Sequence, residues 1–157
     1  MWKFITSIFY KNEKKQQVSI LKDSFKNRLS TLSSKEKWDF SYILFKKIFD
    51  VFDFEILREI VDKLLIFHQK EILNQADVDD IHNRINTAKF EDYISLNEAG
   101  YIADLLAIKS DFETEDVMQV IRHFMKIGEC NFHADELVTW NDNIEICWNI
   151  FIQEKTK

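Results

Sequence analysis

The chain has 157 residues, 46% hydrophobic and 31% charged, with a net charge of −6; this composition excludes a disordered segment and disfavours binding to nucleic acid. It contains no proline and only two glycines, which predicts helices rather than sheets and tight turns, because helix interiors reject both residues. Two cysteines are too few for a disulfide framework, and no apolar stretch approaches the roughly 20 residues of a membrane-spanning helix. We expect one helical domain over residues 1–157, located in the cytoplasm, without membrane contact.

The first predicted helix covers about residues 12–32, where apolar residues recur at helical spacing from Val18 to Leu32 and lysines occupy the other face. A second helix is predicted to begin after Ser33, because Ser33 and Glu36 match the capping box that closes helix N-termini. It contains the run WDFSYILFKKIFDVFDF at 38–54, which has seven aromatic residues in seventeen positions.

This aromatic run has two apolar sides when it is placed on a helix that turns by about 100° per residue. The first side carries Trp38, Tyr42, Phe45, Phe49 and Phe52, and the second carries Phe40, Leu44, Ile48 and Val51. A helix that is apolar on two sides is normally central and packed from both, so we expect a core helix. A partner-binding groove is the alternative, whereas charges within the run, among them Lys46, Lys47 and Asp50, disfavour membrane insertion.

Further helices are predicted from start signals and apolar periodicity. Asp53 begins a helix that extends to about residue 74, Asp77 begins a short one, Ser95 with Glu98 the next, and Asp111 or Thr114 the sixth. Gly128 lies where a left-handed C-terminal cap is expected for that sixth helix.

The last segment is compatible with two structures. Leu137, Trp140, Ile144, Cys147 and Phe151 fit a helix, but IEICWNIFI at 144–152 also alternates as a strand does. We favour the helix, because no partner strand is evident elsewhere and an isolated strand leaves backbone groups unpaired. The predicted fold class is therefore all-α, a compact single-domain bundle of about seven helices, with one short C-terminal strand in place of the last helix as the alternative.

Motifs of the common enzyme classes are missing from the sequence. It has no glycine-rich phosphate loop, no G-x-S-x-G, and neither the H-E-x-x-H nor the E-x-x-H pattern of helical metal sites. Cys130 and His133 have the spacing of two metal ligands, but a structural zinc site normally needs four and no second pair is evident. We therefore predict a protein that is not an enzyme, with no catalytic residues, no cofactor and no metal.

Acidic residues gather at two predicted helix starts. Residues 1–50 carry eleven Lys/Arg against five Asp/Glu, whereas residues 51–157 carry ten against twenty-two. Carboxylates in a first turn favour the helix dipole, but seven in two short stretches exceed what capping requires. If the two helix ends lie side by side, they form one negative field that attracts a basic protein and repels nucleic acid.

Aromatic residues near these carboxylates are candidate anchors, because Phe and Trp concentrate at interface centres. The predicted partner-binding residues are Asp77, Asp79, Asp80, Asp111, Phe112, Glu113, Glu115, Asp116 and Trp140. Asp80 and Arg84 also share a helix face, where we interpret them as ordinary i,i+4 neighbours rather than acid–base machinery.

No motif identifies a family, and no stretch can be aligned with one. In general character, as a small, acidic, helical chain without an active site, it resembles the immunity proteins that bacteria encode beside polymorphic toxins. That resemblance implies a non-enzymatic inhibitor of a basic, nuclease-type toxin. Two alternatives stay open: a helical scaffold, regulator or homodimer that associates through the aromatic helix, and a helical enzyme or metal-binding module whose site is assembled from distant residues.

Overall fold

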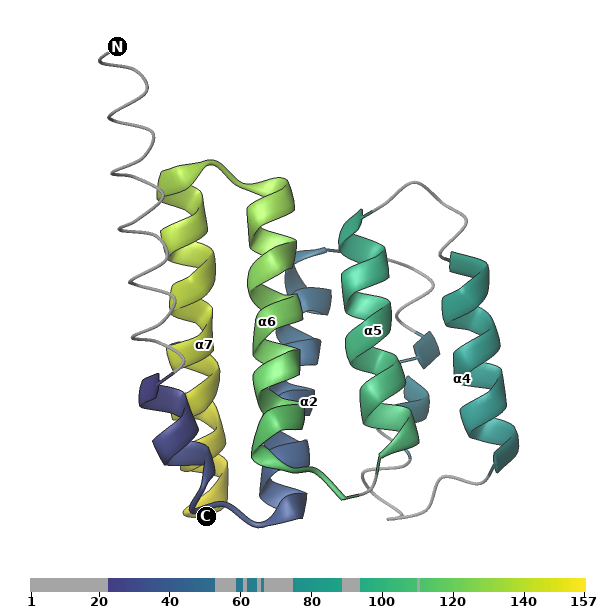
Figure 1. Ribbon diagram of the computed structural model, residues 1–157, viewed down its shortest axis with the longest axis horizontal. Helices are drawn as coiled ribbons and strands as arrows, with labels where there is room; N and C mark the ends of the chain where they lie inside the picture. The colour runs from purple at the N-terminus through teal and green to yellow at the C-terminus, as the bar shows by residue number, and fades with distance from the viewer. Residues whose placement is uncertain are drawn as a thin grey trace. The chain divides into compact units, whose positions relative to one another are not determined.

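A computed structural model of the chain describes residues 23–52, 59–60, 62–64, 66, 75–88, 94–109 and 111–157, without the side chains of 85–88 and 94–96. Within these ranges every regular element is a helix, in seven segments, and none is a strand (Figure 1). The predicted all-α class, a bundle of about seven helices, is confirmed. Most of the predicted helix at 12–32, and the predicted Asp53 cap, lie outside the described residues.

The chain divides into two units, Met1–Leu32 and Ser33–Lys157. In the first unit residues 23–29 are helical, and the Arg28 guanidinium lies 4.8 Å from the centre of the Phe25 ring. The extent of a single domain over residues 1–157 stays a prediction. Everything that follows concerns the second unit.

Five helices of the second unit are described from end to end: α2 (Ser34–Val51), α4 (Gln75–Ala88), α5 (Ile94–Ile108), α6 (Thr114–Asn131) and α7 (Ala134–Lys155). In Figure 1, α4, α5, α6 and α7 form a row in which each helix is antiparallel to the next. Helix α2 lies behind this row and packs on α5, α6 and α7. Of these described helices, none is long and apolar enough to cross a membrane.

The predicted capping box begins α2. The Glu36 backbone N–H donates to Ser33 Oγ at 3.3 Å, and the Ser33 N–H donates to Glu36 Oε2 at 2.7 Å. Most of both apolar sides of α2 is buried: Trp38, Tyr42 and Phe45 on one, Phe40, Leu44 and Ile48 on the other. Toward the end of the run Phe49 and Phe52 are half-buried and Val51 is 46% exposed. The indole Nε1 of Trp38 donates to the carbonyl of Leu106 on α5 at 2.9 Å. The aromatic run is therefore a core element, as the two-sided pattern predicts.

The predicted boundaries of the later helices need three corrections. Helix α5 begins at Ile94, so Ser95 lies inside it rather than at its cap. Helix α4 begins at Gln75, which places Asp77 in its first turn. Helix α6 is capped by Glu113 rather than by Asp111 or Thr114. The Glu113 N–H donates a hydrogen bond to the Asp116 carboxylate at 2.9 Å.

Gly128 is not a C-terminal cap. It lies inside α6, buried, and α6 continues to Asn131, whose side-chain amide donates to the Ile127 carbonyl at 2.6 Å. A Cβ at position 128 would lie 2.8 Å from Cγ and Nε1 of Trp140, and closer still to Cδ1. The glycine therefore allows α7 to bring an indole ring against the α6 backbone.

The last segment is helical throughout. Helix α7 runs unbroken to Lys155, so the alternative of a C-terminal strand is wrong. Its buried residues are the ones with helical spacing: Leu137, Trp140, Ile144, Cys147 and Phe151. The alternation at 144–152 arises because α7 also carries apolar residues on its outer side, where Ile146, Ile150 and Ile152 are 47%, 40% and 36% exposed. Trp148 packs inward, with its ring edge-on to Phe40 at 5.2 Å.

Candidate functional site

One of the three carboxylates of the acidic cluster on α4, that of Asp80, is paired with neighbouring cations. Asp80 forms ion pairs with Lys63 and with Nε of Arg84, the latter at 3.0 Å, and Arg84 also pairs with Glu59. The interpretation of Asp80 and Arg84 as i,i+4 neighbours is confirmed. Asp79 is exposed and accepts a hydrogen bond from the Gln75 side chain at 2.9 Å.

Asp77, the third member of this cluster, is half-buried in the first turn of α4. Of the three predicted α4 residues, Asp79 is the most accessible to a partner. Asp80 contributes little net field, because two cations share its charge.

The second acidic cluster separates into internal and exposed residues. Asp116 is buried and pairs with Lys109, whose Nζ lies 2.7 Å from Oδ1. Phe112 is buried, and its N–H donates to Ser34 Oγ at the start of α2 at 2.6 Å. Asp111, Glu113 and Glu115 are exposed. At this helix start Phe112 and Asp116 therefore serve the fold, Asp111 and Glu115 face solvent, and Glu113 caps α6 while it is exposed.

Trp140 is an internal residue of the α6–α7 contact. Its Nε1 donates to the Phe124 carbonyl at 2.7 Å, and its ring stacks on the Phe124 ring at 4.4 Å between centroids. Burial thus removes Phe112, Asp116 and Trp140 from the predicted partner surface, and the prediction is corrected for these three. The physical reason is that aromatic rings and an N3 carboxylate each gain more from packing or capping than from exposure.

The two acidic helix starts do not adjoin. Helices α4 and α6 run in the same direction, so both helices begin at the lower side of the row in Figure 1. Helix α5 packs between them. On the facing sides of α4 and α5, His82 Nδ1 lies 3.3 Å from Asp104 Oδ1. The single continuous negative field expected from adjacent helix ends is therefore divided by α5.

Exposed residues lie near the connection between α5 and α6, where α6 begins. Ile108, the last residue of α5, is 62% exposed, the largest fraction among the large hydrophobic residues described. Exposed carboxylates follow it at Asp111, Glu113 and Glu115. We call these four residues the acidic corner. Protein-binding surfaces combine exposed apolar residues with charged ones, and the acidic corner brings both kinds together along the chain.

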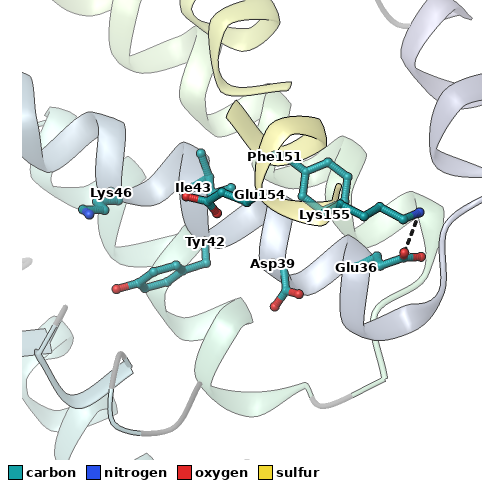
Figure 2. A pocket seen from close by; sticks show the side chains of 8 residues that line it. All are labelled: Glu36, Asp39, Tyr42, Ile43, Lys46, Phe151, Glu154 and Lys155. Atoms are coloured by element: carbon teal, nitrogen blue, oxygen red, sulfur yellow. Dashed lines mark ion pairs between the residues drawn. The ribbon is translucent and has the colours of Figure 1, made fainter. Parts of the chain in front are cut away.

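A groove of about 370 Å³ lies between α2 and α7 (Figure 2). Its lining mixes both charges with apolar residues: Glu36, Asp39, Tyr42, Ile43, Lys46, Phe151, Glu154 and Lys155. At one end Lys155 Nζ lies 2.6 Å from Glu36 Oε1, and in Figure 2 Tyr42 and Lys46 point away from this pair. The hydrogen bond from Lys155, with that from the Ser33 backbone, lowers the pKa of Glu36 to about 2.

A buried carboxylate joins a histidine and a lysine across α5 and α6. Glu98 is 3% exposed, with His123 Nδ1 2.5 Å from Oε2 and Lys126 Nζ 2.6 Å from Oε1. Burial by itself would raise the pKa of Glu98, but the hydrogen bonds from Lys126 and His123 outweigh it and leave this pKa below its usual value. The same contact raises the pKa of Lys126.

Sequence reasoning missed this cluster. The i,i+3 spacing of His123 and Lys126 on one helix face was a readable signal. Glu98 was instead assigned to the predicted capping box at 95–98, because its partners lie in another helix, 25 residues away along the chain for His123. No local pattern specifies that pairing.

Neither cysteine shows a built reactive or metal-binding environment. Cys130 is an exposed free thiol, and Cys147 is a buried one whose pKa burial raises to about 11. Within the described part of the chain, no group of three or more His, Cys, Asp or Glu residues is arranged to hold a metal ion.

Comparison with protein-family models, with curated protein sequences and with solved structures found no match. Any function assigned to this chain therefore rests on its own residues and their geometry.

Proposed function

We propose that this protein is a non-enzymatic inhibitor that binds a basic protein through the acidic corner. The observation that carries this proposal is the exposure of Ile108 at 62%, beside three exposed carboxylates that follow it in the chain. A large apolar side chain at the centre of a charged surface supplies a desolvated anchor. The carboxylates around it supply selectivity for a positive partner and accelerate the encounter.

The local cations do not cancel the charge of the acidic corner. Lys109 is paired with Asp116, which is not part of the corner, and it offsets the charge of Glu113 only in part. Arg122 lies 3.8 Å from Glu115, and both side chains are more than half exposed, so the pair is worth only about 0–1 kcal/mol. Asp111 and Glu113 add further negative charge close by, so the corner keeps a negative potential toward solvent.

The charge distribution along the chain supports the same class of partner. Residues 51–157 carry ten Lys/Arg against twenty-two Asp/Glu, and the acidic corner belongs to this part. On this basis, and on its resemblance in character to immunity proteins, we propose a bacterial, cytoplasmic immunity protein that neutralises a basic, nuclease-type toxin by covering its positive surface. Such a surface would not bind nucleic acid, because both carry the same charge.

The alternative of a homodimer formed through the aromatic helix loses its support. The rings that would form that interface, Trp38, Phe40, Tyr42 and Phe45, are buried in the unit itself. A dimer through α2 would require the unit to open, at the cost of its core packing.

The proposal is tested first by gene neighbourhood, where it expects a large secreted protein with a basic toxin domain encoded directly upstream, and then by binding to that domain. The triple variant Asp111→Lys, Glu113→Lys, Glu115→Lys should lower the association rate constant by about tenfold or more in low salt, and less in high salt. A matched control reverses three exposed carboxylates elsewhere, Glu129, Asp135 and Asp142, and so makes the same change in net charge.

Stopped-flow or surface-based kinetics at two salt concentrations measure both variants. The proposal fails if the corner and control variants slow association equally, because only net charge would then matter. It also fails if the chain neither binds that domain nor protects cells that express it.

A further inference from the structure

A second group of side chains lies on facing sides of α5 and α6 and has no part in the acidic corner. It consists of Glu98, Tyr101, His123 and Lys126. Glu98 precedes Ile108 by ten residues, which is about 15 Å along α5. This group combines a buried carboxylate, an accessible imidazole and a lysine.

The carboxylate of Glu98 fixes the protonation pattern of the imidazole. Because Lys126 holds Glu98 in its ionised form, both carboxylate oxygens are acceptors, and His123 Nδ1 must carry the proton that it donates at 2.5 Å. In the neutral ring the lone pair is then on Nε2. No described residue forms a hydrogen bond with Nε2, and 28% of the side chain is exposed.

Two further contacts prepare this nitrogen for reaction. The Tyr101 ring stacks on the imidazole at 5.3 Å, with 23° between the planes, and so fixes its orientation. Lys126 follows one helical turn after His123 and has a side chain that is 55% exposed. A carboxylate on the far nitrogen makes an imidazole a better nucleophile. The Lys126 ammonium is bound to Glu98, where it offsets the carboxylate charge that would otherwise repel an anionic electrophile.

We infer that His123 is a phosphoryl-acceptor site, with Glu98 as the positioning residue and Lys126 as the residue that offsets the charge of Glu98. The donor belongs to the phosphoramidates, the class of P–N compounds that also includes a phosphohistidine of another protein. The Nε2 lone pair forms a bond to phosphorus while the P–N bond of the donor breaks. The electron pair of that bond leaves with the donor nitrogen, which takes a proton from solvent.

The proton on Nδ1 stays between His123 and Glu98 throughout this transfer. The phosphorylated ring carries a positive charge, which the buried carboxylate stabilises, and no oxidation or reduction occurs. This site is independent of the proposed binding function, because neither its residues nor its chemistry involve the acidic corner.

The test uses the purified full-length chain with phosphoramidate itself as the probe, followed by intact mass, ³¹P NMR and peptide mapping under alkaline conditions that preserve phosphohistidine. We expect one phosphoryl group, at His123. The chain provides its own internal control in His82, whose Nδ1 also faces a carboxylate, that of Asp104. This contact is longer, 3.3 Å against 2.5 Å at His123, so the carboxylate activates His82 less although its side chain is 51% exposed. His82 should label slowly, and His82→Gln should label as the parent chain does.

Variants then separate the roles of the neighbouring residues. His123→Gln should abolish labelling, Glu98→Gln should slow it by about tenfold or more, and Lys126→Met should slow it less. Circular dichroism verifies that each variant is folded. The inference is overturned if mapping of the parent chain finds the phosphoryl group elsewhere, or spread equally over the four histidines. It is also overturned if a folded Glu98→Gln variant labels at the parent rate.

Discussion

Gly128→Ala gives the most direct test of the packing between α6 and α7. An added Cβ would lie 2.8 Å from two atoms of the Trp140 indole, whereas carbon atoms in contact are normally separated by about 3.5–4.0 Å. The ring must therefore move by about an ångström. Its movement is opposed by the hydrogen bond from Nε1 to the Phe124 carbonyl at 2.7 Å and by the stack on the Phe124 ring at 4.4 Å.

The size of the effect follows from three contributions. Overpacking of a buried site costs about 1–3 kcal/mol. Weakening of the buried indole hydrogen bond costs about 1 kcal/mol more. Alanine is favoured over glycine inside a helix by about 1 kcal/mol, which offsets part of this. We expect a net loss of about 2 kcal/mol in the free energy of unfolding, or a melting temperature lowered by roughly 4–8 °C for a chain of this size.

Chemical denaturation followed by circular dichroism and tryptophan fluorescence measures this loss. Glu129→Ala, at the exposed neighbouring position of α6, is the matched control and should change stability by less than about 0.5 kcal/mol. In a Trp140→Ala background Gly128→Ala should cost less, because the indole atoms nearest the new methyl group are gone. The reasoning would be refuted if Gly128→Ala were as stable as the parent chain, or stabilised it.

Two further predictions concern titratable groups. The folded pKa of Glu36 is about 2, below the value of 4.5 for a free carboxyl, so its pair with Lys155 stabilises the fold above pH 4.5 and is lost as pH falls toward 2. Lys155→Met should therefore lower the melting temperature at pH 7 by an amount that corresponds to about 0–1 kcal/mol. The difference in melting temperature from the parent chain should shrink as pH falls from 4.5 toward 2. A difference that grows in this range would contradict the assignment. Of the two free thiols, Cys130 should react with a thiol reagent in the native protein at pH 7.5, whereas Cys147 should react only on unfolding, because it is buried and its pKa is about 11. Equal labelling rates in native protein would show that α7 opens readily.

Local patterns predicted the parts of the fold that local physics determines. The Ser33–Glu36 capping box depends on residues three apart, and the two-sided burial of α2 depends on a periodicity within one helix. The helical state of α7 also follows from spacing, since Trp140 and Ile144 are buried in the register of a helix. Each of these signals is complete within one segment of the sequence.

The rest depends on which segments meet, and no single segment specifies that. Gly128 has the composition signal of a helix end, yet it is explained by an indole from α7. Glu98 has the signal of a capping box, yet its partner is His123 on α6. Phe112 follows an exposed carboxylate and lies within a charged stretch, yet it is buried. In each case a tertiary contact overrides the local preference.

The same limit applied to the candidate site. Acidic composition predicted a negative surface, but it could not separate the exposed Asp111, Glu113 and Glu115 from the internal Asp116. It also gave no reason to single out Ile108, which is apolar and continues the helical pattern of α5. Its exposure is a property of where the helix ends, and only the structure supplies it.

The connection between α5 and α6 is fastened at several points. The Phe112 N–H is held by Ser34 at the start of α2, Lys109 is tied to Asp116, and the Glu113 N–H is bonded to the same carboxylate. A partner that docks here would meet a surface already in its final form, so little conformational entropy would be lost on association. Binding would then resemble two rigid bodies fitting together, and its speed would be governed by diffusion and charge rather than by rearrangement of the chain.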